Sequence, residues 1–485
     1  MRRRIGILWL FTLAIVLPAY SHHIKPGATK TMPVTTSSAK ARDLYERAMT
    51  DYENLYLERA NIGWRAAVEA DPNFALAYAW IAFNGRDPAE SAAARQKAKS
   101  LEPKVTAGER LMIEWICNVQ AGDFLPGIAA MNDMLEMYPK DKRLLYLAGN
   151  WLMGEDSHEQ AEKILNRALA VDKDYPAALN DLAYVYARNR EFAKAFQAMD
   201  RYTAILPKEP NPQDSYGELK RMAGDFEGAL AHYQAALKID PDFISSQLGL
   251  GDTYALMGEQ AHARAEYDKA IQGAHTDADR LDYGLQRAMT WVREGNFVEA
   301  DQAFAAVAEN AHHLGIHLEE AQAYRYTSMY QAEDETALKD LALAQDALTH
   351  PPDIAPSDRE EERSRILRYV VVRALRAGNQ ELADKTLGQL ENMAESSRSK
   401  VIQDSYHGAA GTLLMAKQKY GDAIAHLEED MNNPYSLEQL ARAYSETGAT
   451  DKMHEISARL GGTNIPTIEQ AMVVPGVRSR RPENP

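Results

Sequence analysis

The sequence predicts an all-α fold, a solenoid in which short helical hairpins stack side by side. Three observations predict it. Small and large apolar residues recur with a fixed spacing of 34 positions over five consecutive units. Glycines and prolines stand where such helices would have to end. The chain of 485 residues is 45% hydrophobic and rich in alanine, which favours helix and supplies a large core.

The repeat is carried by four series of positions, two of small residues, one of large residues and one mixed. They agree on one period and run without insertion or deletion from Gly108 to Asp277. Such agreement indicates repeated supersecondary units. The four series are Gly149, Ala183, Gly217 and Gly251; Ala161, Ala195, Ala229 and Ala263; Leu165, Met199, Tyr233 and Tyr267; and Ala168, Tyr202, Ala236 and Ala270.

One unit illustrates how the spacing sets the structure. Ala229, Tyr233 and Ala236 are separated by four and three residues, so they form one stripe of a helix. Gly224 ends the preceding helix, because the left-handed conformation is easiest for glycine. Pro241 stops the second helix, since proline cannot continue it. Each unit is therefore predicted to be a hairpin whose apolar face only its neighbours can cover.

The turn position of Gly224 is also glycine at 122 and 258, but the two units between hold Asp156 and Arg190 there. With drift and insertions the pattern continues on both sides, and we expect about a dozen units. The N-terminal part opens one helix with a predicted capping box, Thr106 with Glu109.

The pattern resembles the tetratricopeptide repeat. The resemblance is carried by ADPNFALAYAWIAF from Ala70 and by PNPQDSYGELKRMAGDFEGALAHYQAALKIDP from Pro210. With AGERLMIEW and NNPYSLEQLARAYSETG, the chain is similar to a bacterial, often exported, tetratricopeptide-repeat family without assigned activity. The resemblance covers about residues 40–461. It implies a right-handed superhelix of stacked hairpins that binds other proteins, and it names no partner.

The composition shifts predict six segments. Polar residues after the N-terminal apolar run indicate a leader, THPPDIAPSDREEER interrupts the repeats, and the C-terminal stretch loses periodicity. Ser357 and Glu360 form a second predicted capping box that restarts helix after Pro356. The segments are a signal peptide (1–21), a flexible leader (22–39), a repeat array (40–348), an interrupting loop (349–363), C-terminal repeats (364–461) and a disordered tail (462–485).

The N-terminus has the pattern of a secretory signal peptide. Arg2 to Arg4 precede an apolar run from Ile5 to Leu17, and Ala19 and Ser21 form a small-x-small exit. We therefore expect cleavage after Ser21 and a periplasmic or secreted protein. The alternative is an uncleaved anchor, which would be the only membrane contact, but the run is shorter than the roughly 20 residues of a spanning helix.

Charge and cysteine content exclude some classes of function. Seventy carboxylates against 54 Lys and Arg give a net charge of −16, which repels a phosphate backbone, so no nucleic-acid partner is expected. Cys117 is the single cysteine, so the chain forms no intramolecular disulfide and no Cys-based zinc site. Its apolar neighbours on a predicted helix indicate a buried thiol.

Motifs of catalysis are missing from the sequence. It has no GxGxxG, GxxxxGK[ST], HExxH or GxSxG, so we predict no enzyme, no catalytic residue and no cofactor. AHHLGIHLEE contains a weak metal candidate, because His313 and His317 would share one face of a continuous helix. A polar helix end is the simpler interpretation, and we assign no metal to it.

The resemblance places binding on the concave groove, which the first helix of each unit lines. Asp214, Glu218 and Asp252 would repel a carboxylate, so the carboxylate clamp of the chaperone-binding relatives is not expected here. Tyrosine, asparagine and acids favour an extended peptide with polar or basic side chains. The candidate groove residues are Arg143, Tyr146, Asn150, Asn180, Tyr184, Asp214, Glu218, Arg221 and Asp252.

Taken together, the sequence predicts an exported interaction scaffold that binds protein or peptide partners in the cell envelope. The alternatives are a repeat protein that binds an envelope polymer such as glycan, and a non-catalytic accessory subunit of an envelope enzyme. Exposed groove aromatics would favour glycan, and Tyr146 and Tyr184 are the two candidates.

Export generates the first testable prediction. Intact-mass analysis of the protein from its native envelope should show a chain of residues 22–485, because the signal is cleaved after Ser21. Recovery of the full-length chain in the membrane pellet would contradict cleavage and favour an anchor.

Overall fold

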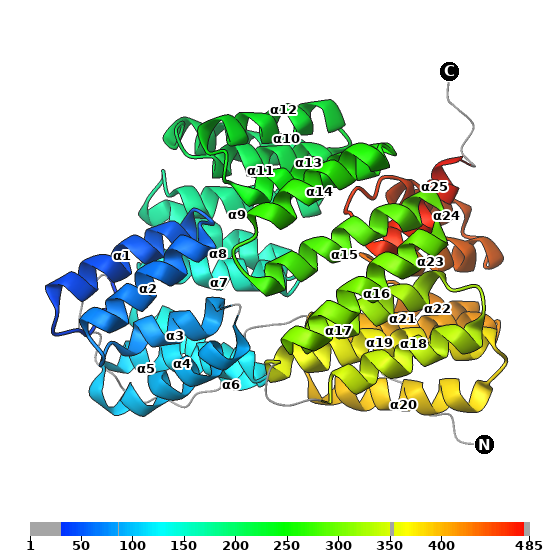
Figure 1. Ribbon diagram of the computed structural model, residues 1–485, viewed down its shortest axis with the longest axis horizontal. Helices are drawn as coiled ribbons and strands as arrows, with labels where there is room; N and C mark the ends of the chain where they lie inside the picture. Colours follow the sequence, from blue (N-terminus) through cyan, green and yellow to red (C-terminus); the bar gives the residue numbers. More distant parts are fainter. Residues whose placement is uncertain (1–30, 86, 350–353, 480–485) are drawn as a thin grey trace.

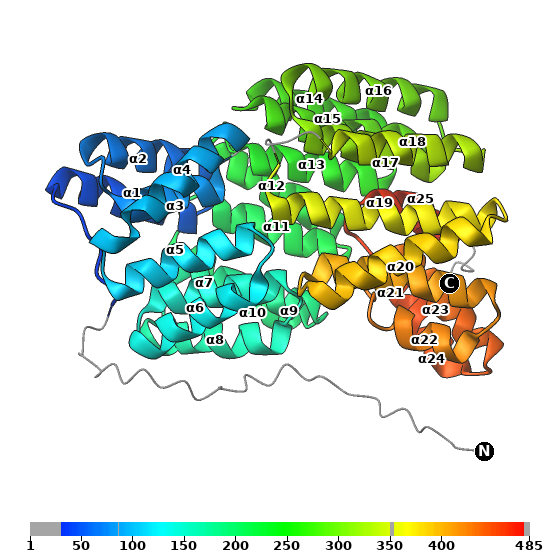
Figure 2. The ribbon, with the colours of Figure 1, turned by 90° about the horizontal axis from the view of Figure 1, so that it is seen from below.

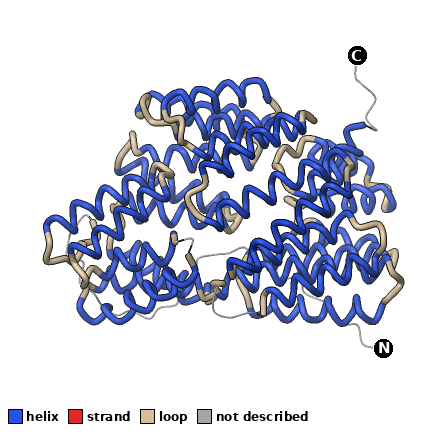
Figure 3. Tube along the Cα trace, viewed as in Figure 1, coloured by secondary structure: helices blue, strands red, loops and turns tan. Residues whose placement is uncertain are grey.

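The chain is helical throughout the part that the structure describes. The computed structural model describes residues 31–85, 87–349 and 354–479, which form 25 α-helices, one 3-10 helix and no strand (Figure 3). None of the helices in these ranges has an apolar stretch long enough to cross a bilayer. The predicted signal peptide, the first part of the leader and the last six residues of the tail lie outside the described residues.

Consecutive helices pair into twelve antiparallel hairpins, and a single helix follows them (Figure 1). The hairpins are α1 (Ala39–Glu53) with α2 (Leu57–Ala70), α3 (Ala75–Asn84) with α4 (Pro88–Leu101), α5 (Ala107–Gln120) with α6 (Phe124–Met137), α7 (Lys142–Gly154) with α8 (His158–Val171), α9 (Pro176–Arg188) with α10 (Phe192–Ile205), α11 (Asn211–Ala223) with α12 (Phe226–Ile239), α13 (Ile244–Met257) with α14 (Gln260–Gly273), α15 (Asp277–Glu294) with α16 (Phe297–Leu314), α17 (His317–Tyr330) with α18 (Asp334–Ala347), α19 (Pro356–Arg376) with α20 (Gln380–Ser396), α21 (Lys400–Ala416) with α22 (Tyr420–Leu427), and α23 (Pro434–Glu446) with α24 (Thr450–Gly461). The 3-10 helix η1 (Glu102–Lys104) joins α4 to α5, and α25 (Ile468–Ser479) closes the described chain.

Within a hairpin, the small residue of the first helix meets the large residue sixteen positions later on the second. A Cβ atom added to Gly149 would lie 2.6 Å from the side chain of Leu165, and one added to Gly251 would lie 2.8 Å from the ring of Tyr267. Even a methyl group is therefore too large at these positions. The contact confirms the predicted register, and it explains why the two series of small and large residues share one period.

The turns confirm the register independently. Gly224 and Gly258 have φ angles of 88° and 90°, in the left-handed region. Asp156 and Arg190, which occupy the same position in two other units, adopt φ angles of 57° and 61°. The turn thus keeps one backbone conformation even where the side chain makes it less favourable.

The leader is not a free tether where the structure describes it. The backbone N–H groups of Met32 and Thr35 donate to the carboxylates of Asp141 (2.8 Å) and Glu109 (2.6 Å). Farther along, the backbone N–H of Ser37 donates to Asp71 (3.0 Å). The prediction of a flexible leader is therefore wrong for residues 32–38, because buried acids of the first units supply acceptors for its backbone.

The interrupting loop is shorter than predicted, because α19 already begins at Pro356. Ala355 is the residue before the first turn, and no side chain caps it. The predicted capping box of Ser357 with Glu360 is thus wrong, since proline in the first turn starts the helix one step earlier. The box of Thr106 with Glu109 is present as predicted.

The predicted disordered tail contains the helix α25. This helix packs beside α15 and α23 (Figure 1), and Val474 in it is completely buried. Arg293 of α15 donates a hydrogen bond to Gln470 of α25. The absence of a 34-residue period therefore does not mean the absence of structure here, because α25 is a single helix that packs between α15 and the last hairpin.

Units that are distant in sequence also meet. Figure 2 shows α21–α24 beside the α7–α10 region, and the backbone N–H of Lys400 donates to the carboxylate of Glu155 (3.2 Å). Asn464 donates to the backbone carbonyl of Met222 (3.3 Å). The solenoid therefore curves far enough for its C-terminal part to contact its middle.

The core stripe generates a prediction about stability. Ala229 is completely buried beside Tyr233, so Ala229→Leu should overpack the hairpin and lower the free energy of unfolding by about 1–3 kcal/mol. Ala231→Leu, on the exposed face of the same helix, is the matched control and should be nearly neutral. Denaturant unfolding measures both, and a neutral Ala229→Leu would show that the register is wrong.

Candidate binding surface

The nine candidate groove residues lie on four successive first helices, α7, α9, α11 and α13. They form two rows with the repeat period and two flanking arginines, Arg143 and Arg221. The residues of the inner row, Tyr146, Asn180 and Asp214, are buried. The residues of the outer row, Asn150, Tyr184, Glu218 and Asp252, are half-buried. None of the nine is a fully exposed side chain.

Side chains of the outer row form hydrogen bonds with Asp181 and Arg221 on the first helices and with Tyr267 on α14. We call these contacts the polar ladder (Asn150, Asp181, Tyr184, Glu218, Arg221, Asp252 and Tyr267). Asn150 donates to Asp181 (3.0 Å), and the hydroxyl of Tyr184 donates to Glu218 (2.8 Å). The partners of each of these two bonds lie on the first helices of neighbouring hairpins, so the ladder joins one hairpin to the next.

The ladder continues around Arg221, which is almost fully buried. Its guanidinium donates to Glu218 (3.1 Å) and to Asp252, and the hydroxyl of Tyr267 also donates to Asp252 (2.7 Å). The expected acidic patch is therefore paired internally, and Arg221 offsets two of its three carboxylates. These contacts hold α11, α13 and α14 together. A binding role for the nine residues stays a prediction.

Two acids in this region are held away from water. Burial raises the pKa of Asp214 to about 7, and its carboxylate accepts a hydrogen bond from Ser246 (2.6 Å). Burial also raises the pKa of Asp181 to about 7. Asp181 lies outside the two predicted rows, although it is adjacent to Asn180. The sequence did not predict its burial, because the angle between hairpins decides which of two adjacent residues faces the next helix.

The remaining flanking arginine is engaged by the first unit of the array. Arg143 of α7 forms ion pairs with Glu53 (2.6 Å) and Glu46 (2.9 Å) of α1. Its side chain therefore connects the fourth hairpin with the first.

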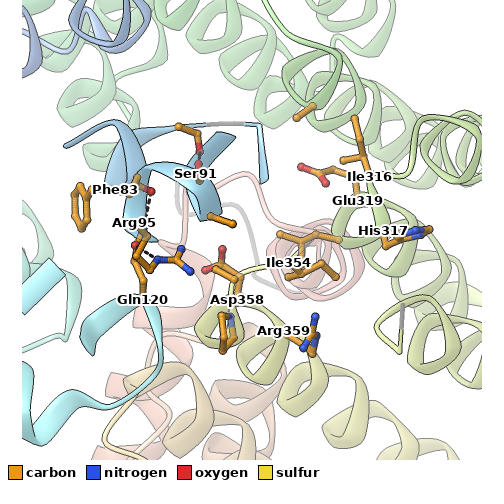
Figure 4. A pocket seen from close by; sticks show the side chains of 17 residues that line it. Phe83, Ser91, Arg95, Gln120, Ile316, His317, Glu319, Ile354, Asp358 and Arg359 are labelled. Atoms are coloured by element: carbon orange, nitrogen blue, oxygen red, sulfur yellow. Dashed lines mark hydrogen bonds between the residues drawn. The ribbon is translucent and has the colours of Figure 1, made fainter. Parts of the chain in front are cut away.

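A cleft opens elsewhere on the molecule, between units far apart in sequence, and we call it the inter-arm cleft (Figure 4). One wall comes from α3, α4 and α5, and the other comes from α15, α17 and α19. Its volume is about 470 Å³. The lining residues are Ala82, Phe83, Gly85, Ser91, Ala92, Arg95, Gln120, Ala278, Ile316, His317, Leu318, Glu319, Ile354, Ala355, Pro356, Asp358 and Arg359.

The polar groups of the first wall are fixed by bonds within that wall. Arg95 Nε donates to Gln120 Oε1 (2.9 Å), and Gln120 Nε2 donates to the carbonyl of Ala82 (2.6 Å). Ser91 Oγ donates to the carbonyl of Gly85 (3.1 Å). These dashed contacts in Figure 4 give the cleft a preorganised polar side.

The second wall carries Arg359 on α19. Its Nε atom is buried and has no hydrogen-bond partner among the described residues. A buried donor without an acceptor costs about 1–3 kcal/mol. Sequence reasoning missed this residue, because no local pattern shows which distant units the curvature of the solenoid brings together.

The predicted histidine pair does not form. Gly315 adopts a φ angle of 69° and ends α16, so His313 and His317 belong to different helices. His313 is exposed, and its Nε2 lies 3.9 Å from a carboxylate oxygen of Glu309. The assumption of a continuous helix through AHHLGIHLEE was wrong, because a glycine in the left-handed conformation turns the chain there. His317 instead lies near His312 and Glu320.

The single cysteine is buried as expected. Cys117 is 1% exposed on α5, and burial raises the pKa of its thiol. The thiol is therefore poorly suited to react or to ligate a metal.

Comparisons with known proteins agree with the repeat. Residues 217–258 match the family model described as TPR repeat, the tetratricopeptide repeat. The chain is 22% identical over 348 residues to the TPR repeat-containing protein YpiA of Bacillus subtilis, a match that covers 71% of this chain and 72% of that protein. It is 23% identical to cellulose synthase operon protein C of Xanthomonas axonopodis pv. citri, over 70% of this chain and 23% of that protein.

Other relatives are matched over small parts of their length. Of the human protein O-mannosyl-transferase TMTC1 the chain covers 18%, at 28% identity over 31% of this chain, so the activity in that name does not transfer. Among solved structures, yeast Tom70 aligns with 85% of this chain and 96% of its own, at 14% identity and a TM-score of 0.42. The Cut9–Hcn1 structure aligns with 85% of this chain and 78% of its own, at 14% identity and a TM-score of 0.44.

The hairpins, the small-to-large contact with its 34-residue period and the matched family model lead to one assignment. Residues 217–258 carry a tetratricopeptide repeat, and the described chain folds as a solenoid of such hairpins.

Proposed function

We propose that the chain is an exported, non-catalytic scaffold that binds a protein partner through an extended segment of that partner in the inter-arm cleft. The repeat architecture supports protein binding in general, and the N-terminal signal pattern supports an envelope location. The cleft is the place on the described surface where two distant parts of the solenoid can hold one ligand together.

The observation that carries the proposal is Arg359. Its buried Nε lacks an acceptor within the described chain, while the cleft beside it is open. A backbone carbonyl or a carboxylate of a bound segment would supply that acceptor. Arginine suits this task because its planar guanidinium can bind two oxygens at once and stays charged.

The rest of the lining fits a polypeptide. Phe83, Ile316 and Ile354 offer apolar surface, and Glu319 and Asp358 offer carboxylates (Figure 4). A volume of about 470 Å³ is in the range of sites that hold a small ligand, which corresponds to a few residues of a peptide. The mixture of apolar and oppositely charged groups favours a short segment with varied side chains over a uniform polymer.

The polar ladder is a poorer place to test binding. Its carboxylates partner Arg221, so replacing Glu218 and Asp252 by alanine would leave a buried guanidinium without acceptors. The loss of a partner from a buried ion pair destabilises a protein by several kcal/mol, about 3–5 in measured cases. Weaker binding of such a variant would then report unfolding as well as recognition.

The test of the cleft is a charge reversal with a control on the same helix. The mature chain, residues 22–485, is used to capture partners from envelope extract, and the affinity of a captured partner is then measured. Arg359→Glu should weaken that affinity by about tenfold or more, because a charge-assisted hydrogen bond is worth about 1.5–3 kcal/mol. Arg363→Glu, four residues on and paired with the half-exposed Glu360, should leave it unchanged.

Equal affinities of the two variants would place recognition outside the cleft, with the groove rows as the next candidates. Capture of an envelope glycan in place of a protein would contradict the proposed partner class and support the alternative function.

A further inference from the structure

We propose that His312, His317 and Glu320 form a binding site for a late first-row divalent cation, with Zn²⁺ as the favoured ion. The site lies at the turn between α16 and α17 and adjoins the proposed peptide site, with which it shares His317 alone. Figure 4 shows His317 at the edge of the inter-arm cleft, with its ring directed away from the cleft.

The turn is what brings the three residues together. Gly315 N–H donates to the carbonyl of His312 (3.1 Å), and Ile316 N–H donates to the carbonyl of Ala311 (2.9 Å), which closes α16. α17 then starts at His317, with Glu320 one helical turn farther along. His312 in the last turn of one helix therefore faces two residues in the first turn of the next.

The three side chains already converge on one point. His312 Nδ1 lies 3.1 Å from Glu320 Oε1, and His317 Nδ1 lies 2.8 Å from Glu320 Oε2. One ligand atom from each residue falls within 4.8 Å of the other two. In a tetrahedral zinc site with bonds of 2.0–2.2 Å, neighbouring ligand atoms are about 3.4 Å apart. Only small movements would open the space for an ion.

Two of the three ligand side chains are buried and held in place, and the third lies at the surface. The side chains of His317 and Glu320 are 10% and 8% exposed, whereas that of His312 is 61% exposed. An ion can therefore reach the site from solvent past His312. A preorganised pair of ligands lowers the cost of ordering the site on binding.

The donor set selects the kind of ion. Two imidazole nitrogens with one carboxylate suit Zn²⁺ and the neighbouring ions Co²⁺, Ni²⁺ and Cu²⁺, whereas Mg²⁺ and Ca²⁺ prefer oxygen ligands alone. Three protein ligands also leave one tetrahedral position for water or for a group of a partner. The carboxylate of Glu320 now accepts the hydrogen bonds of both imidazoles. A bound cation would contact the two imidazole nitrogens and the carboxylate in place of these hydrogen bonds.

The neighbouring histidine provides a matched control. His313 is adjacent to His312 in sequence and similarly exposed, at 73%, but it lies outside the cluster. His312→Ala therefore removes a ligand, while His313→Ala removes an equivalent surface histidine. Glu320→Gln keeps the size of the side chain and removes its charge.

The experiment titrates the untagged mature chain, after dialysis against a chelator, with Zn²⁺ by calorimetry and with Co²⁺ by visible absorption. We expect one ion per chain and the strong visible bands of four-coordinate Co²⁺. His312→Ala and Glu320→Gln should each weaken Zn²⁺ binding by about tenfold or more, since even the loss of a residue that only supports a ligand costs about 10–100-fold. His313→Ala should bind like the wild type.

Histidines at the predicted mature N-terminus could also hold metal, so His22→Ala with His23→Ala is measured alongside and should retain the site. The proposal is overturned if the wild-type chain binds no Zn²⁺. It is equally overturned if His312→Ala and Glu320→Gln bind Zn²⁺ as tightly as the wild type does, because the ion then binds elsewhere. Circular dichroism of each variant verifies that the helices remain folded.

Discussion

The close contact between a small residue on the first helix and a large one on the second is the constraint on which the structure depends. Gly149 against Leu165 and Gly251 against Tyr267 leave no room even for a methyl group. Because small residues recur at this position with the period of the chain (Gly149, Ala183, Gly217 and Gly251), the same close approach of two helices can recur in successive hairpins. Equal hairpins stack regularly, and their apolar faces cover one another.

This regular stacking determines where polar groups can be buried. Equivalent positions of neighbouring first helices lie side by side, so Tyr184 reaches Glu218, 34 residues on. Arg221 reaches Asp252 on the next first helix, 31 residues on. The ladder is thus a consequence of the repeat, and it gives partners to most of the polar groups that it buries, although the Nε of Arg221 has none among the described residues. We propose recognition where the repeat is interrupted, because there the buried Nε of Arg359, without an acceptor among the described residues, adjoins an open cleft.

The sequence predicted the parts of the structure that repeat. The hairpins, the core residues such as Ala229 and Tyr233, and the turns at Gly224 and Asp156 follow from spacing alone. The predictions were wrong where one local feature outside the repeat decides the structure. Gly315 breaks the helix between His313 and His317, Pro356 starts α19 early, and α25 packs on the array without belonging to it. The cleft could not be predicted for a different reason: Phe83 and Arg359 line the same cleft only because of the curvature summed over many hairpins.

A double-mutant cycle on Gly149 and Leu165 tests the central contact most directly. Gly149→Ala alone should lower the free energy of unfolding by about 1–3 kcal/mol, because its methyl group overpacks against Leu165. In the background of Leu165→Ala the same change should be neutral or stabilising, since alanine is the better helix former by about 0.5–1 kcal/mol. A coupling of about 1 kcal/mol or more is therefore expected. If the two effects instead add to within about 0.5 kcal/mol, the contact does not set the separation of the helices.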